Sequence, residues 1–190
     1  MKKLTEKELL KAIEGCKKND RQSQKIIYMH YYSTLLPVCY RYTSNRDEAL
    51  DLLHDVFLKI FEKIKKYKHT GSFEGWLKRL TVNYAIDRFR KNKNIRPLST
   101  DDEEHPIQIS EEEPDDDSIF TRVSSSDLGD AIRQLPDRYK MVFCLYYLEE
   151  MSHKEIAEKL NINEGTSKSN LFKAKAKLKD ILTKKLLLKS

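Results

Sequence analysis

The sequence predicts an all-α protein of two small helical domains joined by an acidic flexible linker, with a helix-turn-helix in the second domain. Three observations predict this fold class. Glycine and proline are scarce, at five each among 190 residues, whereas helix-forming Leu, Lys and Glu abound. Residues 4–92 and 127–187 repeat apolar side chains at the spacing of amphipathic helices. The segment between them is acidic and too poor in apolar residues to fold alone.

The first domain, residues 1–92, is expected to hold helices at about 5–16, 21–42 and 46–66 and a fourth from Ser72, which together can form a compact bundle. Pro37 marks a possible kink in the second helix. The third helix has an expected buried stripe of Leu50, Leu53, Phe57, Phe61 and Ile64. Its aspartates at 47, 51 and 55 form one acidic row. We interpret this row as a docking strip for a basic protein surface; a solvated face, partly relieved by an Asp55–Lys59 pair, is the alternative.

The fourth helix has a mixed polar face opposite an expected buried side of Phe73, Leu77, Leu80 and Tyr84. That face carries Trp76, Arg79, Asn83, Asp87 and Arg90, with Lys78, Arg88, Lys91 and Lys93 nearby. Such a row could stack an unpaired base and hold its backbone. For a lone Trp, a place in the core is the better interpretation.

The linker, residues 93–126, concentrates negative charge. Between Pro97 and Thr121 it has no Lys or Arg and ten acidic residues. The formal net charge of the whole chain is +6, so the rest of the chain carries a net charge of +16. A basic body indicates a polyanionic partner, although lysines could merely solubilise a helical protein.

The second domain, residues 127–190, is expected to form helices at about 127–135, 137–149, 152–160 and 163–187, with Pro136 separating the first two. A capping box of Ser152 and Glu155 starts the third helix. Asn161 suits the left-handed turn that follows it, and Asn163 can cap the last helix. In the last helix, Ser167, Leu171, Ala174 and Leu178 should face inward, leaving outward Lys168, Ser169, Phe172 and Lys173, with Asn170 and Lys175. This arrangement would place a helix in the DNA major groove; an ordinary amphipathic helix pair is the alternative.

Other function classes lack their signals. The three cysteines lie far apart without a C-x-x-C, which favours buried reduced thiols over a disulfide or zinc site. The N-terminal segment has no apolar signal-peptide core, and no apolar run approaches the ~20 residues of a membrane span, so we expect a cytoplasmic protein without membrane insertion. No P-loop, nucleophile motif or histidine ligand spacing is present, and we therefore expect no enzyme, metal, cofactor or small-molecule substrate.

With these residues in place, the chain resembles the bacterial sigma-70 family, extracytoplasmic-function (ECF) group. The stretch DEALDLLHDVFLK, residues 47–59, resembles the polymerase-binding helix, which implies polymerase contacts by Asp47, Asp51, Asp55, Val56 and Lys59. The stretch FEGWLKRLTVNYAIDRFRK, residues 73–91, resembles the segment that melts and recognises the −10 element, which implies DNA contacts by Trp76, Lys78, Arg79, Asn83, Asp87, Arg88, Arg90 and Lys91. The stretches LPDRY, residues 135–139, and EGTSKS, residues 164–169, resemble the −35 reading region, which implies contacts by Glu164, Gly165, Thr166, Lys168, Ser169, Asn170, Phe172 and Lys173.

The resemblance implies core RNA polymerase and promoter DNA as partners, with strand opening as the task and frequently an anti-sigma factor as a further partner. The linker would thread through polymerase toward the RNA path, or act only as a spacer. The family often has Val at Ser167 and Arg at Asn170, Lys173 and Lys175. Since Arg and Lys read guanine differently, no particular promoter sequence carries over.

Two alternative functions would explain fewer of these sequence features. A dimeric helix-turn-helix regulator would bind duplex DNA without polymerase, and would give no role to the acidic strip or the Trp/Asn/Arg face. A metal-dependent nuclease using the carboxylate run would need a rigid metal site, which a flexible linker cannot preorganise.

Overall fold

The protein is built from helices arranged in two compact units. The computed structural model describes residues 4–95 and 123–187, and these ranges contain no strand, so the all-α prediction is confirmed. The helices are α1 (Glu6–Lys17), α2 (Arg21–Arg41), α3 (Arg46–Lys63), the 3-10 turn η1 (Ile64–Lys66), α4 (Phe73–Ile95), α6 (Ser125–Arg133), α7 (Asp137–Tyr147), α8 (His153–Leu160) and α9 (Glu164–Leu187).

The division between the units falls inside α4. Residue contacts separate Met1–Ala85 from Ile86–Ser190, whereas α4 continues as one helix to Ile95. The expected linker, residues 93–126, begins within the last three residues of α4 and ends within the first two of α6. Its acidic run lies outside the described residues, so the expected domain limits at 92 and 127 stay a prediction.

Side-chain caps start the helices of the first unit. The Thr5 hydroxyl and the Glu8 carboxylate form a capping box at α1. The carboxylate of Asp20 accepts a hydrogen bond from the Ser23 amide at 2.8 Å, which caps α2. Asn45 likewise accepts from the Glu48 amide at 2.9 Å and caps α3. These caps fix the helix starts to within one residue of the positions expected from sequence.

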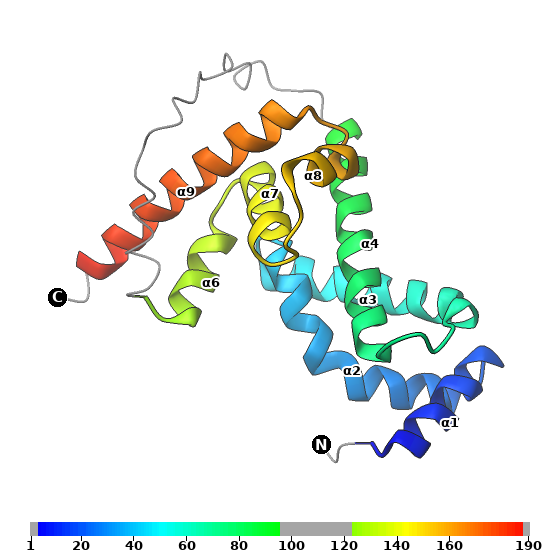
Figure 1. Ribbon diagram of the computed structural model, residues 1–190. Coiled ribbons are helices and arrows are strands. Elements are labelled where there is room, and N and C mark those ends of the chain that lie inside the picture. Colours follow the sequence, from blue (N-terminus) through cyan, green and yellow to red (C-terminus); the bar gives the residue numbers. More distant parts are fainter. Residues whose placement is uncertain (1–3, 96–122, 188–190) are drawn as a thin grey trace. The chain divides into compact units, whose positions relative to one another are not determined.

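The core of the first unit lies between α1, α2, α3 and the start of α4 (Figure 1). α1 and α2 approach closely at Gly15, where an added Cβ would lie 2.0 Å from Ser23 Oγ. The buried face of α3 is wider than expected. Leu53 and Phe57 are buried as predicted and Leu50 and Phe61 only half-buried, while the remaining buried residues of α3 are Ala49, Leu52, Val56 and Ile60.

In the second unit, α6, α7 and α8 all pack along the long helix α9 (Figure 1). Pro136 separates α6 from α7, as expected from sequence. The buried apolar residues include Ile132, Leu145, Ile156, Leu160, Leu178 and Leu182. α9 thus serves as the axis against which the shorter helices place their apolar faces.

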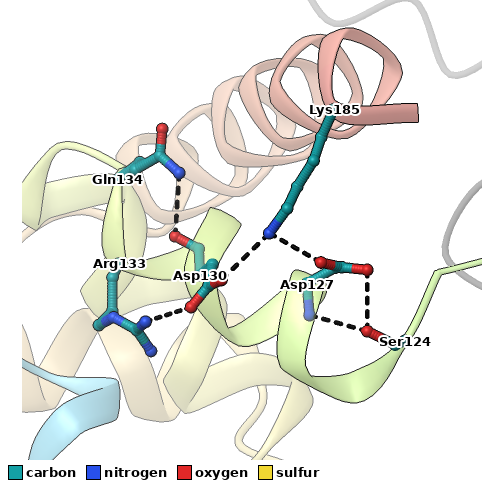
Figure 2. Close-up of polar contacts among 6 residues, drawn as sticks. All are labelled: Ser124, Asp127, Asp130, Arg133, Gln134 and Lys185. Carbon is teal, nitrogen blue, oxygen red and sulfur yellow. Dashed lines mark hydrogen bonds and ion pairs between the residues drawn. The ribbon is translucent and has the colours of Figure 1, made fainter. Parts of the chain in front are cut away.

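An ion-pair cluster joins the C-terminal end of α9 to α6 (Figure 2). Lys185 Nζ lies 2.8 Å from Asp127 Oδ1 and 3.0 Å from Asp130 Oδ2. Asp130 also pairs with Arg133, and Ser124 caps α6 by accepting a hydrogen bond from the Asp127 amide at 3.1 Å. Among the described residues, no helix is both long and apolar enough to cross a membrane.

Candidate nucleic-acid interface

α8 and α9 form the expected helix-turn-helix. The Ser152 hydroxyl and Glu155 carboxylate make the capping box that starts α8. Asn161 ends α8 in the left-handed conformation, with φ 54° and ψ 54°. One residue separates it from Asn163, whose Oδ1 accepts a hydrogen bond from the Thr166 amide at 2.6 Å and caps α9. All three sequence signals therefore act where they were expected, because each works within a few residues of chain.

The inward side of α9 is buried as predicted, whereas only part of the predicted outward side is fully exposed. Leu171, Ala174 and Leu178 are buried, and Ser167 is 0% exposed. On the other side Lys168 is exposed, and Phe172 exposes 39% of its surface, unusually much for a phenylalanine. Among the other expected contact residues, Glu164 and Gly165 are exposed and a further set is half-buried, namely Thr166, Ser169, Asn170 and Lys173. Glu164 pairs with Lys168 at 3.2 Å, so the first turn of this face carries both signs of charge.

One polar contact between the two helices was missed from sequence. His153 Nδ1 lies 2.9 Å from Ser167 Oγ, and the imidazole ring stacks on Tyr146 of α7 with centroids 4.9 Å apart. Burial and the nearby Lys168 lower the pKa of His153, against an opposing influence of Glu164. From sequence, Ser167 was expected only to face inward, at a position where the family often has Val.

The expected −10 residues lie along α4 in different environments. Arg79, Asn83 and Lys91 are exposed, and Arg88 is half-buried. Lys78 pairs with Glu74 at 2.7 Å, and Asp87 pairs with Arg90. Trp76 differs from these, because its ring is half-buried, stacks on Phe73 with centroids 5.6 Å apart and lies 5.5 Å from Tyr67. Trp76 thus packs against the core of the first unit, the interpretation favoured for a lone Trp.

The expected docking strip on α3 is only partly available to a partner. Asp47 and Asp51 are exposed and Asp55 is half-buried, but Val56 is 0% exposed and belongs to the core. The Val56 side chain therefore cannot contact a docked protein while the helix is packed. Lys59 Nζ lies 2.6 Å from Glu62, a pairing that was not anticipated.

Leu58 is a candidate that sequence reasoning missed. It is 66% exposed, the most exposed large apolar side chain of the described residues. Helical geometry places it on the same side of α3 as Asp47, Asp51 and His54. The signal was available in the sequence, since the 3.6-residue period points the leucine after Phe57 away from the core. An exposed leucine on the acidic side of a helix can anchor a basic protein surface that offers an apolar pocket.

The described residues, which do not include the acidic run of the linker, hold neither a candidate metal-ligand cluster nor a disulfide. Within them, no group of three or more His, Cys, Asp or Glu side chains could hold a metal ion. The three cysteines are buried free thiols, and burial raises the pKa of Cys16 to about 11. Buried thiols of raised pKa are poor nucleophiles.

Comparison with known proteins agrees with this geometry. Two family models match the chain, "Sigma-70 region 2" over residues 27–95 and "Sigma-70, region 4" over residues 125–178. The ECF RNA polymerase sigma factor SigW of Bacillus subtilis (strain 168) is 30% identical over 175 residues, spanning 89% of this chain and 94% of SigW. SigM of the same organism is 31% identical over 153 residues, spanning 80% of this chain and 91% of SigM.

A solved structure of the sigma factor RpoE in complex with the anti-sigma factor NepR from Bartonella quintana is 18% identical, with a TM-score of 0.46, over 84% of this chain and 96% of that chain. The two matched regions occur in the order and at the places where the sequence motifs occur, and the SigW match spans nearly the whole chain. The chain belongs to the ECF sigma factors of the sigma-70 family, the promoter-specific initiation factors that bind RNA polymerase.

Proposed function

We propose that this sigma factor divides its work among three surfaces, one for polymerase, one for the opened −10 strand and one for the −35 duplex. The observation that supports the division most strongly is the helix-turn-helix, which buries one side of α9 and leaves Lys168 and Phe172 exposed on the other. A helix held in this way can enter the major groove without losing its packing.

The polymerase surface consists of Asp47, Asp51 and Leu58 on α3. Asp51→Lys should weaken core-polymerase binding on the order of tenfold or more, because like charges brought together at an interface cost several kcal/mol. Leu58→Asp should act similarly and leave the fold intact, since this side chain is 66% exposed. Glu6→Lys on α1 is the matched control, an exposed carboxylate reversed elsewhere in the same unit. Equal capture of polymerase by Asp51→Lys and Glu6→Lys would refute the strip.

The −10 surface is assigned to Arg79 and Asn83, two exposed side chains one helical turn apart on α4. Extruding a base from the duplex costs a few kcal/mol, which contacts to the captured strand must offset. Asn83→Ala should therefore impair promoter opening, seen as lost permanganate reactivity of thymines. A template with a pre-melted bubble should restore activity. A defect that persists on that template would assign Asn83 to another step.

The −35 surface is the exposed side of α9. Lys168→Ala should weaken binding of the −35 duplex on closed and pre-melted templates alike. Lys184→Ala is the matched control, because Lys184 is an exposed lysine about 160° around the same helix. Run-off transcription with core polymerase distinguishes this proposal from a dimeric regulator, which would bind duplex DNA fully without polymerase.

The chain acts by binding and not by catalysis, in the cytoplasm where polymerase and promoter DNA meet. An anti-sigma factor, which the family implies, would hold it inactive. To test this regulation, the chain is purified from cells together with any bound partner, and run-off transcription is compared before and after that partner is removed.

A further inference from the structure

The contact between His153 and Ser167 links the two helices of the helix-turn-helix. Ser167 is 0% exposed, and its neighbours on the inward side of α9 are the apolar Leu171 and Ala174. A hydroxyl buried there must find a hydrogen-bond partner, because an unsatisfied one is costly. His153 Nδ1, at 2.9 Å, supplies it from the first residue of α8.

Two further contacts fix the position of His153, one through its ring and one through its backbone. Its ring stacks on Tyr146 of α7 at 4.9 Å with an interplanar angle of 25°. Its backbone follows Ser152, which the capping box with Glu155 fixes at the start of α8. The imidazole therefore connects α7, α8 and α9 at one point, and burial, with a smaller contribution from Lys168, lowers its pKa and so favours the neutral ring. A neutral imidazole pairs with a hydroxyl in either tautomer, as acceptor or donor at Nδ1.

We infer that His153 is a positioning residue for −35 recognition, and that its hydrogen bond to Ser167 sets how the first turns of α9 sit on α8. This inference rests on the proposed role of α9. Ser167 is followed directly by Lys168, which is exposed, so a movement that releases Ser167 also moves a side chain of the reading face. A hydrogen bond is directional, whereas an apolar contact at the same position would not be. The pair therefore fixes the rotation of α9 about its own axis as well as its distance from α8.

Three variants of the full chain, each assembled with core polymerase, test the inference. His153→Phe keeps a ring against Tyr146 but removes the hydrogen bond, and Ser167→Ala removes the hydroxyl. The double variant H153F/S167A combines the two changes and replaces the polar pair by an apolar one. Ser33→Ala, an exposed serine of α2, is the control. The probes are a −35 duplex selected from a random library by the wild-type holoenzyme and a scrambled duplex of the same composition.

The measured quantity is the ratio of affinities for the selected and scrambled duplexes, with thermal unfolding recorded in parallel. We expect each single variant to lower this ratio about tenfold, the usual effect of a lost hydrogen bond. The fold-decrease of this ratio in the double variant should be smaller than the product of the fold-decreases in the two single variants. An unchanged ratio in both singles, or fully multiplicative losses, would overturn the inference, since the two side chains would then act independently.

The variants and outcomes separate this inference from the proposed function. If His153→Phe fails to fold, Ser167→Ala, a change of one atom, carries the test alone. If the wild-type holoenzyme selects no sequence, the role of α9 itself is wrong. If it selects a sequence that the single variants bind equally well, only the positioning role of His153 fails.

Discussion

Replacing Trp76 separates a structural from a DNA-contacting role on α4. The ring is half-buried and packs against Phe73 at 5.6 Å and Tyr67 at 5.5 Å. A fully buried Trp→Ala change costs about 3–5 kcal/mol, and each aromatic pair contributes about 0.5–1.5 kcal/mol of that. For a half-buried ring we expect Trp76→Ala to lower the free energy of unfolding by about 2–4 kcal/mol. Trp76→Phe, which keeps a ring beside Phe73, should cost about 1 kcal/mol.

Urea denaturation followed by circular dichroism at 222 nm measures both variants, because Trp76 is the only tryptophan and its fluorescence is lost with it. Promoter opening is then assayed below the unfolding midpoint of each variant. If Trp76 is structural, opening should recover in Trp76→Phe and fall in Trp76→Ala only as the folded fraction falls. Normal stability of Trp76→Ala combined with lost opening would refute this reasoning and place the ring on DNA.

Three further predictions concern the turn, the α6–α9 cluster and the thiols. Asn161→Val should cost about 1–2 kcal/mol in urea denaturation, because its φ of 54° suits Asn or Gly, and Asn161→Gly should cost much less; equal midpoints would contradict this. Lys185→Met should lower the melting temperature at pH 7. The Lys185 hydrogen bond lowers the pKa of Asp130 from 3.8, so this stabilisation is fully present above pH 3.8 and is lost as the pH falls through the lower pKa of the folded protein, where the two melting temperatures should converge. Cys16, with its pKa raised to about 11 by burial, should resist iodoacetamide at pH 8 until the protein is denatured; rapid alkylation of the native protein, read by mass spectrometry, would show otherwise.

Local signals in the sequence predicted the helix starts and the turn of the helix-turn-helix. The capping box of Ser152 and Glu155 and the left-handed Asn161 each act within one helical turn, so no knowledge of the fold is needed to recognise them. The buried positions of α9 follow from its period for the same reason, because that helix packs with one side inward.

Features that depend on packing between helices could not be predicted in this way. Val56 was expected to contact a partner, yet α3 is covered over a wider arc than one apolar stripe, and the 3.6-residue period does not give the width of that arc. The pair of His153 and Ser167 spans 14 residues and exists only because of how α8 crosses α9.

The cluster that joins Lys185 to Asp127 and Asp130 has a consequence for synthesis of the protein on the ribosome. In the first unit α1 packs on α2 and α2 on α3, so each helix meets its partner as soon as the next one emerges. α6 instead waits for the last turns of α9, more than 50 positions downstream, as the Lys185–Asp130 separation of 55 residues shows. Because domains fold as their chains emerge, the first unit should form first and the second only after α9 is complete.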